Sequence, residues 1–135
     1  MAKILIVDDN PDVLKLIANI LESNDYEVKT VSNGASAIKE LESNEYDMVL
    51  TDLMMPDVDG MQVLENAILK IPKTMCIILT GHGTIKSSVE AIKKGAFDYI
   101  TKPVSPSELI IIVEKALKFD NLTCSDNIFI MIFAS

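Results

Sequence analysis

Residues suited to phosphate and metal chemistry follow four short apolar runs of this chain. The runs and the residues that follow them are 4–7 with Asp8 and Asp9, 48–51 with Asp52, 76–79 with Thr80, and 97–101 with Lys102. Such short runs, rich in branched residues, predict strands buried on both faces of a parallel sheet, whose ligands bind at the carboxyl edge. We therefore expect three carboxylates, one hydroxyl and one ammonium at the same edge of the sheet.

The charges of these side chains indicate which chemistry the edge supports. Asp8, Asp9 and Asp52 sum to about −3 when ionised and Lys102 returns about +1, so an empty site carries about −2 and repels itself. Mg²⁺ cancels that charge and prefers oxygen ligands. With the metal bound, Asp52 is suited to act as a nucleophile towards a phosphoryl group, because Mg²⁺ and Lys102 neutralise the transferring oxygens.

Apolar runs alternate with amphipathic stretches five times, which is typical of an α/β fold. We expect strands near 3–8, 26–31, 47–51, 75–80 and 97–101, and helices near 11–24, 34–43, 60–70, 84–94 and 105–118. Short connections and right-handed crossovers favour a doubly wound, flavodoxin-like parallel sheet of five strands in the order 2-1-3-4-5. In that order the carboxyl ends that carry Asp8, Asp9, Asp52, Thr80 and Lys102 surround one pocket.

Local signals set the ends of several helices. Asn10-Pro11 and Ser105-Pro106 each provide a capping residue followed by a first-turn proline, and Gly95 occupies a C-terminal capping position. In the helix near 84–94, Ile85, Val89 and Ile92 are expected to form the apolar stripe.

Composition excludes some classes of function. The chain has 135 residues, enough for one domain, and 20 Asp and Glu against 12 Lys with no Arg, for a net charge of −8. A nucleic-acid surface needs a basic stripe, usually with arginines, so we expect no direct binding to nucleic acid. The acidity suits a cation site and a partner with basic patches.

Several features bear on location. Cys76 and Cys124 lack metal or redox spacing and indicate free thiols in a reducing, cytoplasmic compartment. The first apolar run is only four residues long, so no signal peptide is expected. In the tail of unknown role at 119–135, the apolar run 128–133 is too short to cross a membrane, and we favour a truncated or isolated domain over 1–118.

Four motifs together resemble the receiver domain of bacterial two-component response regulators, over about residues 3–118. They are the acidic pair after Val7, the segment Thr51 to Pro56 with Gly60 beyond it, Thr80-Gly81, and Tyr99 to Pro103. Each motif is weak alone, but all four in order at strand ends are specific. The segments 80–84 and 95–99 are most similar to receivers of the nitrogen-regulatory class of transcriptional activators.

The resemblance implies a phosphorylation-dependent switch rather than an enzyme with a turnover substrate. A sensor histidine kinase would transfer a phosphoryl group to Asp52, with self-catalysed transfer and autodephosphorylation. Mg²⁺ would be bound by Asp8, Asp9, Asp52 and the backbone carbonyl of Met54. Thr80 and Tyr99 would form the switch, which would act on the surface of the fourth helix, fifth strand and fifth helix, where a homodimer could form. The Lys102-Pro103 peptide bond is expected to be cis.

Other interpretations compete with this one. Asp8-Asp9 alone is more often a solvated turn or a helix cap, and Tyr99 is suited to simple packing at a sheet edge. A dehalogenase-type phosphatase would need a second aspartate two residues after Asp52, where this chain has Met54. A pseudo-receiver that is never phosphorylated, and a scaffold that dimerises through the segment 110–112, would both act by contact alone.

Overall fold

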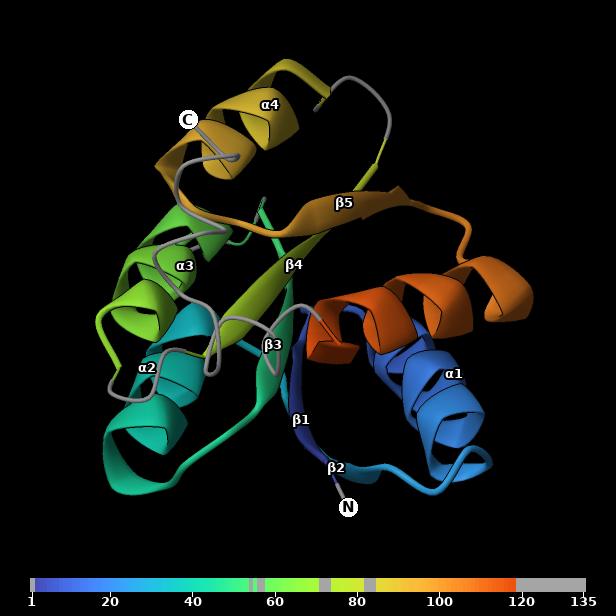
Figure 1. Cartoon of the computed structure of the whole chain (residues 1–135). Coiled ribbons are helices and arrows are strands. Elements are labelled where there is room, and N and C mark those ends of the chain that lie inside the picture. The colour runs from blue at the N-terminus through green and yellow to red at the C-terminus, as the bar shows by residue number, and fades with distance from the viewer. Residues whose placement is uncertain (1, 54, 56–57, 71–73, 82–84, 119–135) are drawn as a thin grey trace.

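The computed structural model describes residues 2–53, 55, 58–70, 74–81 and 85–118. Strands and helices alternate along the chain (Figure 1). They are β1 (Lys3–Val7), α1 (Pro11–Glu22), β2 (Glu27–Val31), α2 (Gly34–Ser43), β3 (Met48–Asp52), α3 (Gly60–Ile68), β4 (Met75–Thr80), α4 (Ile85–Lys94) and β5 (Asp98–Thr101). A C-terminal helix covers residues 106–118. The predicted elements are therefore confirmed, with ends that differ by one or two residues.

The five strands form one parallel sheet in the order β2-β1-β3-β4-β5, as the sequence predicted. Helices α1 and 106–118 cover one face, and α2, α3 and α4 cover the other (Figure 1). Each face therefore has its own apolar core, one around Ile6 and Leu50 and the other around Val49 and Ile78. The doubly wound arrangement places all strand carboxyl ends at the same edge.

The prediction of strands buried on both faces is correct for β1, β3 and β4 and wrong for β5. Every residue of β3 and β4 is buried, and in β1 only Lys3 is not. In β5, Ile100 alone is fully buried, while Asp98 and Tyr99 are half-buried and Thr101 is exposed. The reason is position: β5 is an edge strand, so only one neighbouring strand and part of a helix layer cover it.

Helix α4 also differs from its predicted apolar stripe. Val89 and Ile92 are 42% and 37% exposed, whereas Ala91 is fully buried against the α3 side of the sheet. A helix at the sheet edge has little of the sheet to cover, so it packs closely through a small residue. The side chains of Val89 and Ile92 are consequently left at the surface.

Local capping explains where the helices begin. The side chains of Asn10, Asn33 and Asp59 each accept a hydrogen bond from a backbone N–H in the first turn of α1, α2 and α3. Gly95 ends α4 with a φ of +127°, a conformation that favours glycine. These caps fix the loops that carry the strand-end residues.

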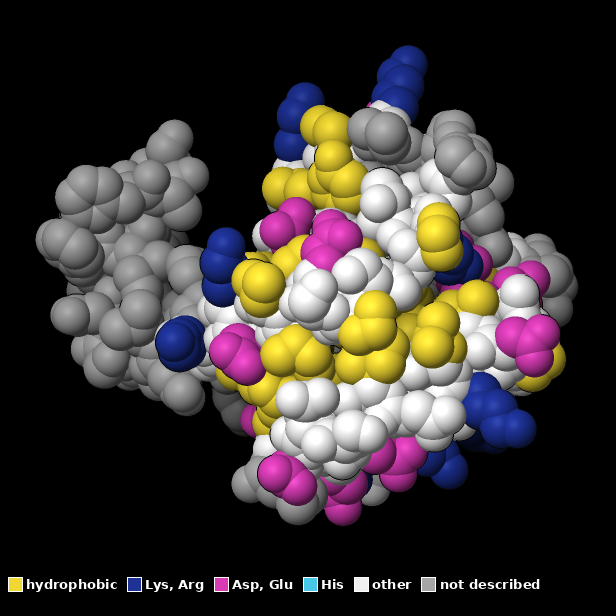
Figure 2. All heavy atoms as spheres, turned by 90° about the vertical axis from the view of Figure 1, so that its right-hand side faces the viewer, with side chains coloured by type: hydrophobic (Ala, Val, Ile, Leu, Met, Phe, Trp, Pro, Cys, Tyr) yellow, Lys and Arg dark blue, Asp and Glu magenta, His cyan; other side chains and the backbone are white. Residues whose placement is uncertain are grey.

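Figure 2 shows the face formed by α1 and the C-terminal helix. Apolar side chains lie across the middle of this face, and Lys side chains lie near its outline rather than in one stripe. Leu16 and Ile111 are the large apolar residues most exposed on these two helices, at 45% and 53%.

Among the residues that the structure describes, no helix is both long enough and apolar enough to cross a bilayer.

Candidate metal and phosphoacceptor site

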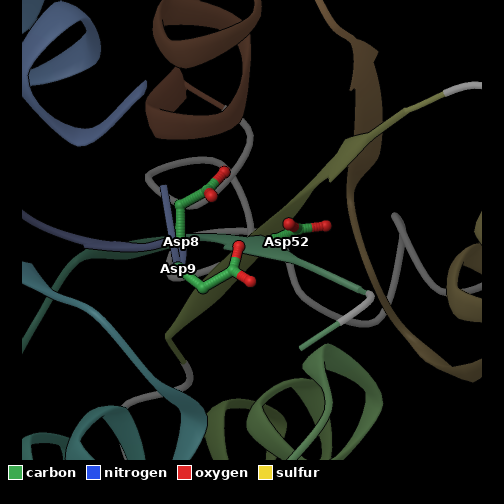
Figure 3. Close-up of side chains that lie close together, drawn as sticks. All are labelled: Asp8, Asp9 and Asp52. Atoms are coloured by element: carbon green, nitrogen blue, oxygen red, sulfur yellow. The ribbon is translucent and has the colours of Figure 1, made fainter. Parts of the chain in front are cut away.

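Three carboxylates lie together at the carboxyl edge of the sheet. Asp8 and Asp9 directly follow β1, and Asp52 is the last residue of the neighbouring strand β3 (Figure 3). One oxygen from each of the three side chains lies within 4.8 Å of the others. Asp8 and Asp52 are buried and Asp9 is exposed, so the group is open to solvent on one side. The structure thus brings together the three acidic residues singled out in the sequence.

Asp8 is the most deeply buried of the three, at 0% exposure. Its Oδ1 accepts a hydrogen bond from the backbone N–H of Asn10 at 2.9 Å. Its Oδ2 forms an ion pair with Lys102 Nζ at 2.6 Å, but no donor among the described residues makes a well-aligned hydrogen bond to it. Because the same ammonium also pairs with Asp52, one positive charge is shared by two buried carboxylates, an excess of negative charge that a further cation would offset.

Lys102 reaches the same group from the segment after β5. Its Nζ lies 3.1 Å from Asp52 Oδ2 as well as 2.6 Å from Asp8 Oδ2, so one ammonium bridges two carboxylates. Burial alone lowers the pKa of Lys102, but contact with Asp8 and Asp52 and their negative charges outweigh burial and raise this pKa. The ammonium is therefore charged at neutral pH. The Lys102-Pro103 peptide bond is cis, as expected.

Thr80 and Tyr99 occupy neighbouring strands beside this group. Thr80 ends β4, one residue beyond Leu79, which is the register partner of Asp52. Its side chain is 1% exposed, and its Oγ1 donates a hydrogen bond to the Gly81 carbonyl at 3.2 Å. Tyr99 is half-buried in β5 and packs against the core cluster that contains Ile78. The edge-strand packing interpretation of Tyr99 is thus compatible with its position.

The loop after β3 is held tightly to the acceptor strand. A Cβ atom added at Gly60 would lie 2.1 Å from the Asp52 carbonyl oxygen, so only glycine fits there. The Gly60 N–H also donates to the Leu53 carbonyl at 3.0 Å. The sequence identified Gly60 only as part of a motif, because a close approach between backbones leaves no signal except the glycine itself. Met54, the remaining predicted metal ligand, lies outside the described residues, as does the tail 119–135.

Comparison with known proteins decides the family. Residues 4–114 match the model of the response regulator receiver domain. The chain belongs to this family. As a receiver domain, it is a signalling module of two-component systems, and receiver domains of response regulators are phosphorylated by sensor histidine kinases.

Curated relatives place this receiver domain near nitrogen-regulatory proteins, which confirms the predicted resemblance. The chain is 35% identical over 117 residues to the nitrogen assimilation regulatory protein NtrX of Azorhizobium caulinodans, covering 85% of this chain and 26% of that protein. It is 38% identical over 117 residues to the transcriptional regulatory protein GlrR of Escherichia coli, covering 87% and 26%. The receiver domain thus spans about a quarter of the length of these relatives.

Solved structures share the fold. A response regulator receiver domain from Clostridium thermocellum superposes with a TM-score of 0.85 at 36% identity, covering 90% of this chain and 98% of that one. NtrX from Brucella abortus, crystallised with ADP, superposes with a TM-score of 0.86 at 32% identity, covering 92% of this chain and 29% of that one. The five-stranded parallel sheet of this receiver domain is therefore that of its family.

Proposed function

We propose that Asp52 accepts a phosphoryl group from a histidine of a sensor kinase in a reaction that requires Mg²⁺. The observation that carries this proposal is the convergence of three carboxylates and one ammonium at the end of β1 and β3. Asp52 is suited to be the acceptor because it is 8% exposed and is already paired with Lys102. Asp8, by contrast, has no exposed surface from which to reach a donor.

The residues present fit a magnesium ion. The formal charge of Asp8, Asp9, Asp52 and Lys102 sums to about −2, the donor atoms of the carboxylates are all oxygens, and the buried Asp8 Oδ2 shares the single Lys102 ammonium with Asp52. Asp8, Asp9, Asp52 and the backbone carbonyl of Met54 would hold the ion. When bound, Mg²⁺ supplies positive charge that stabilises the oxygens of the transferring group.

The side chains of Asp52 and Lys102 promote the phosphoryl transfer, Asp52 by its position as nucleophile and Lys102 by its positive charge. A carboxylate oxygen of Asp52 attacks phosphorus, the O–P bond forms, the P–N bond to the kinase histidine breaks, and the imidazole nitrogen keeps the electron pair. Lys102 lies against Asp52 Oδ2 and would neutralise a phosphoryl oxygen as it arrives. Hydrolysis of the acyl phosphate by water would then return Asp52 to its carboxylate, which gives autodephosphorylation.

The phosphoryl group would act on the surface through Thr80 and Tyr99. We propose that the Thr80 hydroxyl exchanges its bond to the Gly81 carbonyl for one to a phosphoryl oxygen, and that Tyr99 repacks in response. The affected surface consists of α4, β5 and the C-terminal helix, where Val89 and Ile92 are already exposed and a homodimer could form. We place this receiver domain in the cytoplasm, with the sensor histidine kinase as its partner.

The test is phosphorylation by a small phosphodonor. Wild-type chain incubated with phosphoramidate and Mg²⁺ should gain one phosphoryl group by mass spectrometry, and EDTA should prevent the gain. Asp52→Asn should gain none, while Asp98→Asn, which changes a carboxylate at the start of β5 rather than at its carboxyl end, should behave as wild type. A wild-type chain that gains no phosphoryl group would establish a pseudo-receiver that acts by contact alone.

A further inference from the structure

A buried hydroxyl lies next to the acceptor in a row of apolar side chains. Thr51 precedes Asp52 in β3 and is 0% exposed. Its register partners on either side are Val7 in β1 and Ile78 in β4, and Ile78 in turn pairs with Tyr99 in β5. Alternation along a strand directs Thr51 to the same face as Val49, opposite to Leu50. A valine would match its apolar neighbours and the shape of the site.

The hydroxyl has a specific partner at this position. Thr51 Oγ1 donates a hydrogen bond to the Asp52 carbonyl oxygen at 3.0 Å. The same carbonyl oxygen is the atom against which Gly60 packs, and the Gly60 N–H donates to the next carbonyl, that of Leu53. Two consecutive peptides after the acceptor are thus fixed in orientation by Thr51 and Gly60.

We propose that Thr51 is a positioning residue for phosphorylation of Asp52, acting through the bond from its hydroxyl to the Asp52 carbonyl. This inference rests on the proposed function and assigns a further residue to the same site. Fixing the peptide that follows Asp52 fixes the direction in which the chain leaves β3, and hence the position of the acceptor carboxylate relative to Asp8. Small displacements of reacting groups lower rates strongly, so a lost bond of this kind has a measurable effect.

A purely structural role predicts the opposite result. If Thr51 only filled space, replacing its hydroxyl by a methyl group would remove a polar atom from an apolar row and leave phosphorylation unchanged. The positioning role predicts that stability and phosphorylation separate. Thr51→Val should unfold at the same or a higher urea concentration than wild type but accept phosphate more slowly, whereas Thr51→Ser should be less stable but accept phosphate normally.

The experiment measures three quantities on the full chain: the urea midpoint, the rate constant of phosphorylation by phosphoramidate at saturating Mg²⁺, and the dissociation constant of Mg²⁺ alone. Titration calorimetry suits the last, because the sequence has no Trp to report binding by fluorescence. We expect Thr51→Val to lower the rate constant about tenfold and to weaken Mg²⁺ binding about threefold. Thr51→Ser should stay within about twofold of wild type in both.

Val49→Ala is the matched control, since it opens the same buried strand face two residues earlier and keeps the hydroxyl. It should lower the urea midpoint with little change in the rate constant of phosphorylation.

The proposal is overturned if Thr51→Val is phosphorylated and binds Mg²⁺ as wild type does, or if Thr51→Ser or Val49→Ala slows phosphorylation as much as Thr51→Val. A wild-type chain that takes no phosphoryl group rejects the proposed function instead, and the Mg²⁺ affinities of the variants then decide the role of Thr51. Absence of Mg²⁺ binding by wild type as well would overturn both.

Discussion

Both the carboxyl edge and the amino edge of the sheet carry polar residues. At the carboxyl edge the carboxylates repel one another, whereas at the amino edge the polar residues form hydrogen bonds with one another. At the carboxyl edge, Asp8, Asp9 and Asp52 crowd together with a single ammonium, that of Lys102. Like charges are close, one of them is fully buried, and the buried carboxylates of Asp8 and Asp52 share one ammonium. Stability alone would not select such an arrangement.

At the amino edge, by contrast, the polar groups are matched with partners. Tyr46 donates to Glu40 Oε1 at 2.6 Å, Lys3 donates from its backbone N–H to Asp47 Oδ2 at 2.8 Å, and Thr74 Oγ1 donates to the Tyr46 carbonyl at 3.1 Å. The Lys3 ammonium also lies 4.8 Å from the centroid of the Tyr46 ring. These contacts join the starts of β1, β3 and β4.

The difference separates stability from function within one sheet. Groups at the amino edge satisfy one another, so removing one should destabilise the fold and leave phosphorylation intact. The carboxylates at the carboxyl edge repel one another until a cation binds, so removing one carboxylate should stabilise the metal-free fold and abolish phosphorylation. Unfavourable charge at a site of this kind is typical of functional positions.

The largest effect is expected from Gly60→Ala, which would displace the loop after β3 at the carboxyl edge of the sheet. A Cβ atom 2.1 Å from the Asp52 carbonyl oxygen forces the acceptor loop away from β3. Overpacking against backbone should cost about 1–3 kcal/mol of unfolding free energy. Phosphorylation should slow by about 100-fold, because the acceptor is displaced. Urea unfolding and phosphoramidate kinetics measure the two effects.

Gly81→Ala is the control for the stability measurement. A Cβ atom at Gly81 would meet no heavy atom within 4 Å, so this variant should unfold as wild type does. Equal unfolding free energies for wild type and Gly60→Ala would show that the loop after β3 can move away without cost. The close approach of Gly60 to the Asp52 carbonyl oxygen would then not contribute to stability.

A smaller effect of opposite sign is expected from Asp8→Asn. The change removes repulsion from Asp9 and Asp52 and the burial of a charge, and it loses one attraction to Lys102, which keeps Asp52 as its partner. At an effective dielectric of about 20, each carboxylate pair opposes the fold by about 3 kcal/mol before the lost attraction is counted. The lost attraction to Lys102 is about as large as the two repulsions together, so the relief of burying a charge decides the sign, and we expect a net gain of about 1–2 kcal/mol in unfolding free energy without Mg²⁺.

Added Mg²⁺ should then reverse the ranking of the two proteins. Wild type gains about 2.7 kcal/mol when Mg²⁺ is present at 100 times its dissociation constant, while Asp8→Asn gains far less because one ligand is missing. Denaturation with and without the ion provides the comparison. An Asp8→Asn protein less stable than metal-free wild type would show that the carboxyl edge is not strained.

The smallest effect is expected from Tyr46→Phe at the amino edge. Loss of the hydrogen bond to Glu40 should lower the unfolding free energy by about 1 kcal/mol at pH 7 and leave the phosphorylation rate unchanged. A change in that rate would contradict the separation of the two edges.

The pH dependence of Tyr46 provides a second measurement. Burial first, then the hydrogen bond to Glu40 and the charges of Glu40 and Glu27, raise the pKa of Tyr46 above its ordinary value of 10.0. The protonated phenol is therefore favoured in the folded state, so its contribution is complete below pH 10 and declines as the pH rises above that value. Wild type should lose stability in this alkaline range more steeply than Tyr46→Phe.

The sequence by itself determined the elements and their order. Short branched runs specified β1, β3 and β4, the caps Asn10 and Gly95 set helix ends, and the handedness of crossovers left the order 2-1-3-4-5. These features depend on periodicity and local backbone preference, which neighbouring residues alone decide. The strand-end residues of the site followed from the same reasoning, because parallel strands bring their carboxyl ends together.

Only the tertiary structure decided which side chains meet. It turned Val89 and Ile92 of α4 outward, left β5 half-exposed, and placed Lys102 closer to Asp8 than to Asp52. It also revealed that the Thr51 hydroxyl and Gly60 meet at the Asp52 carbonyl. The contacts of Lys102 join residues far apart in the chain. The geometry at the sheet edge and around the Asp52 carbonyl depends on how the layers pack, which no local pattern encodes.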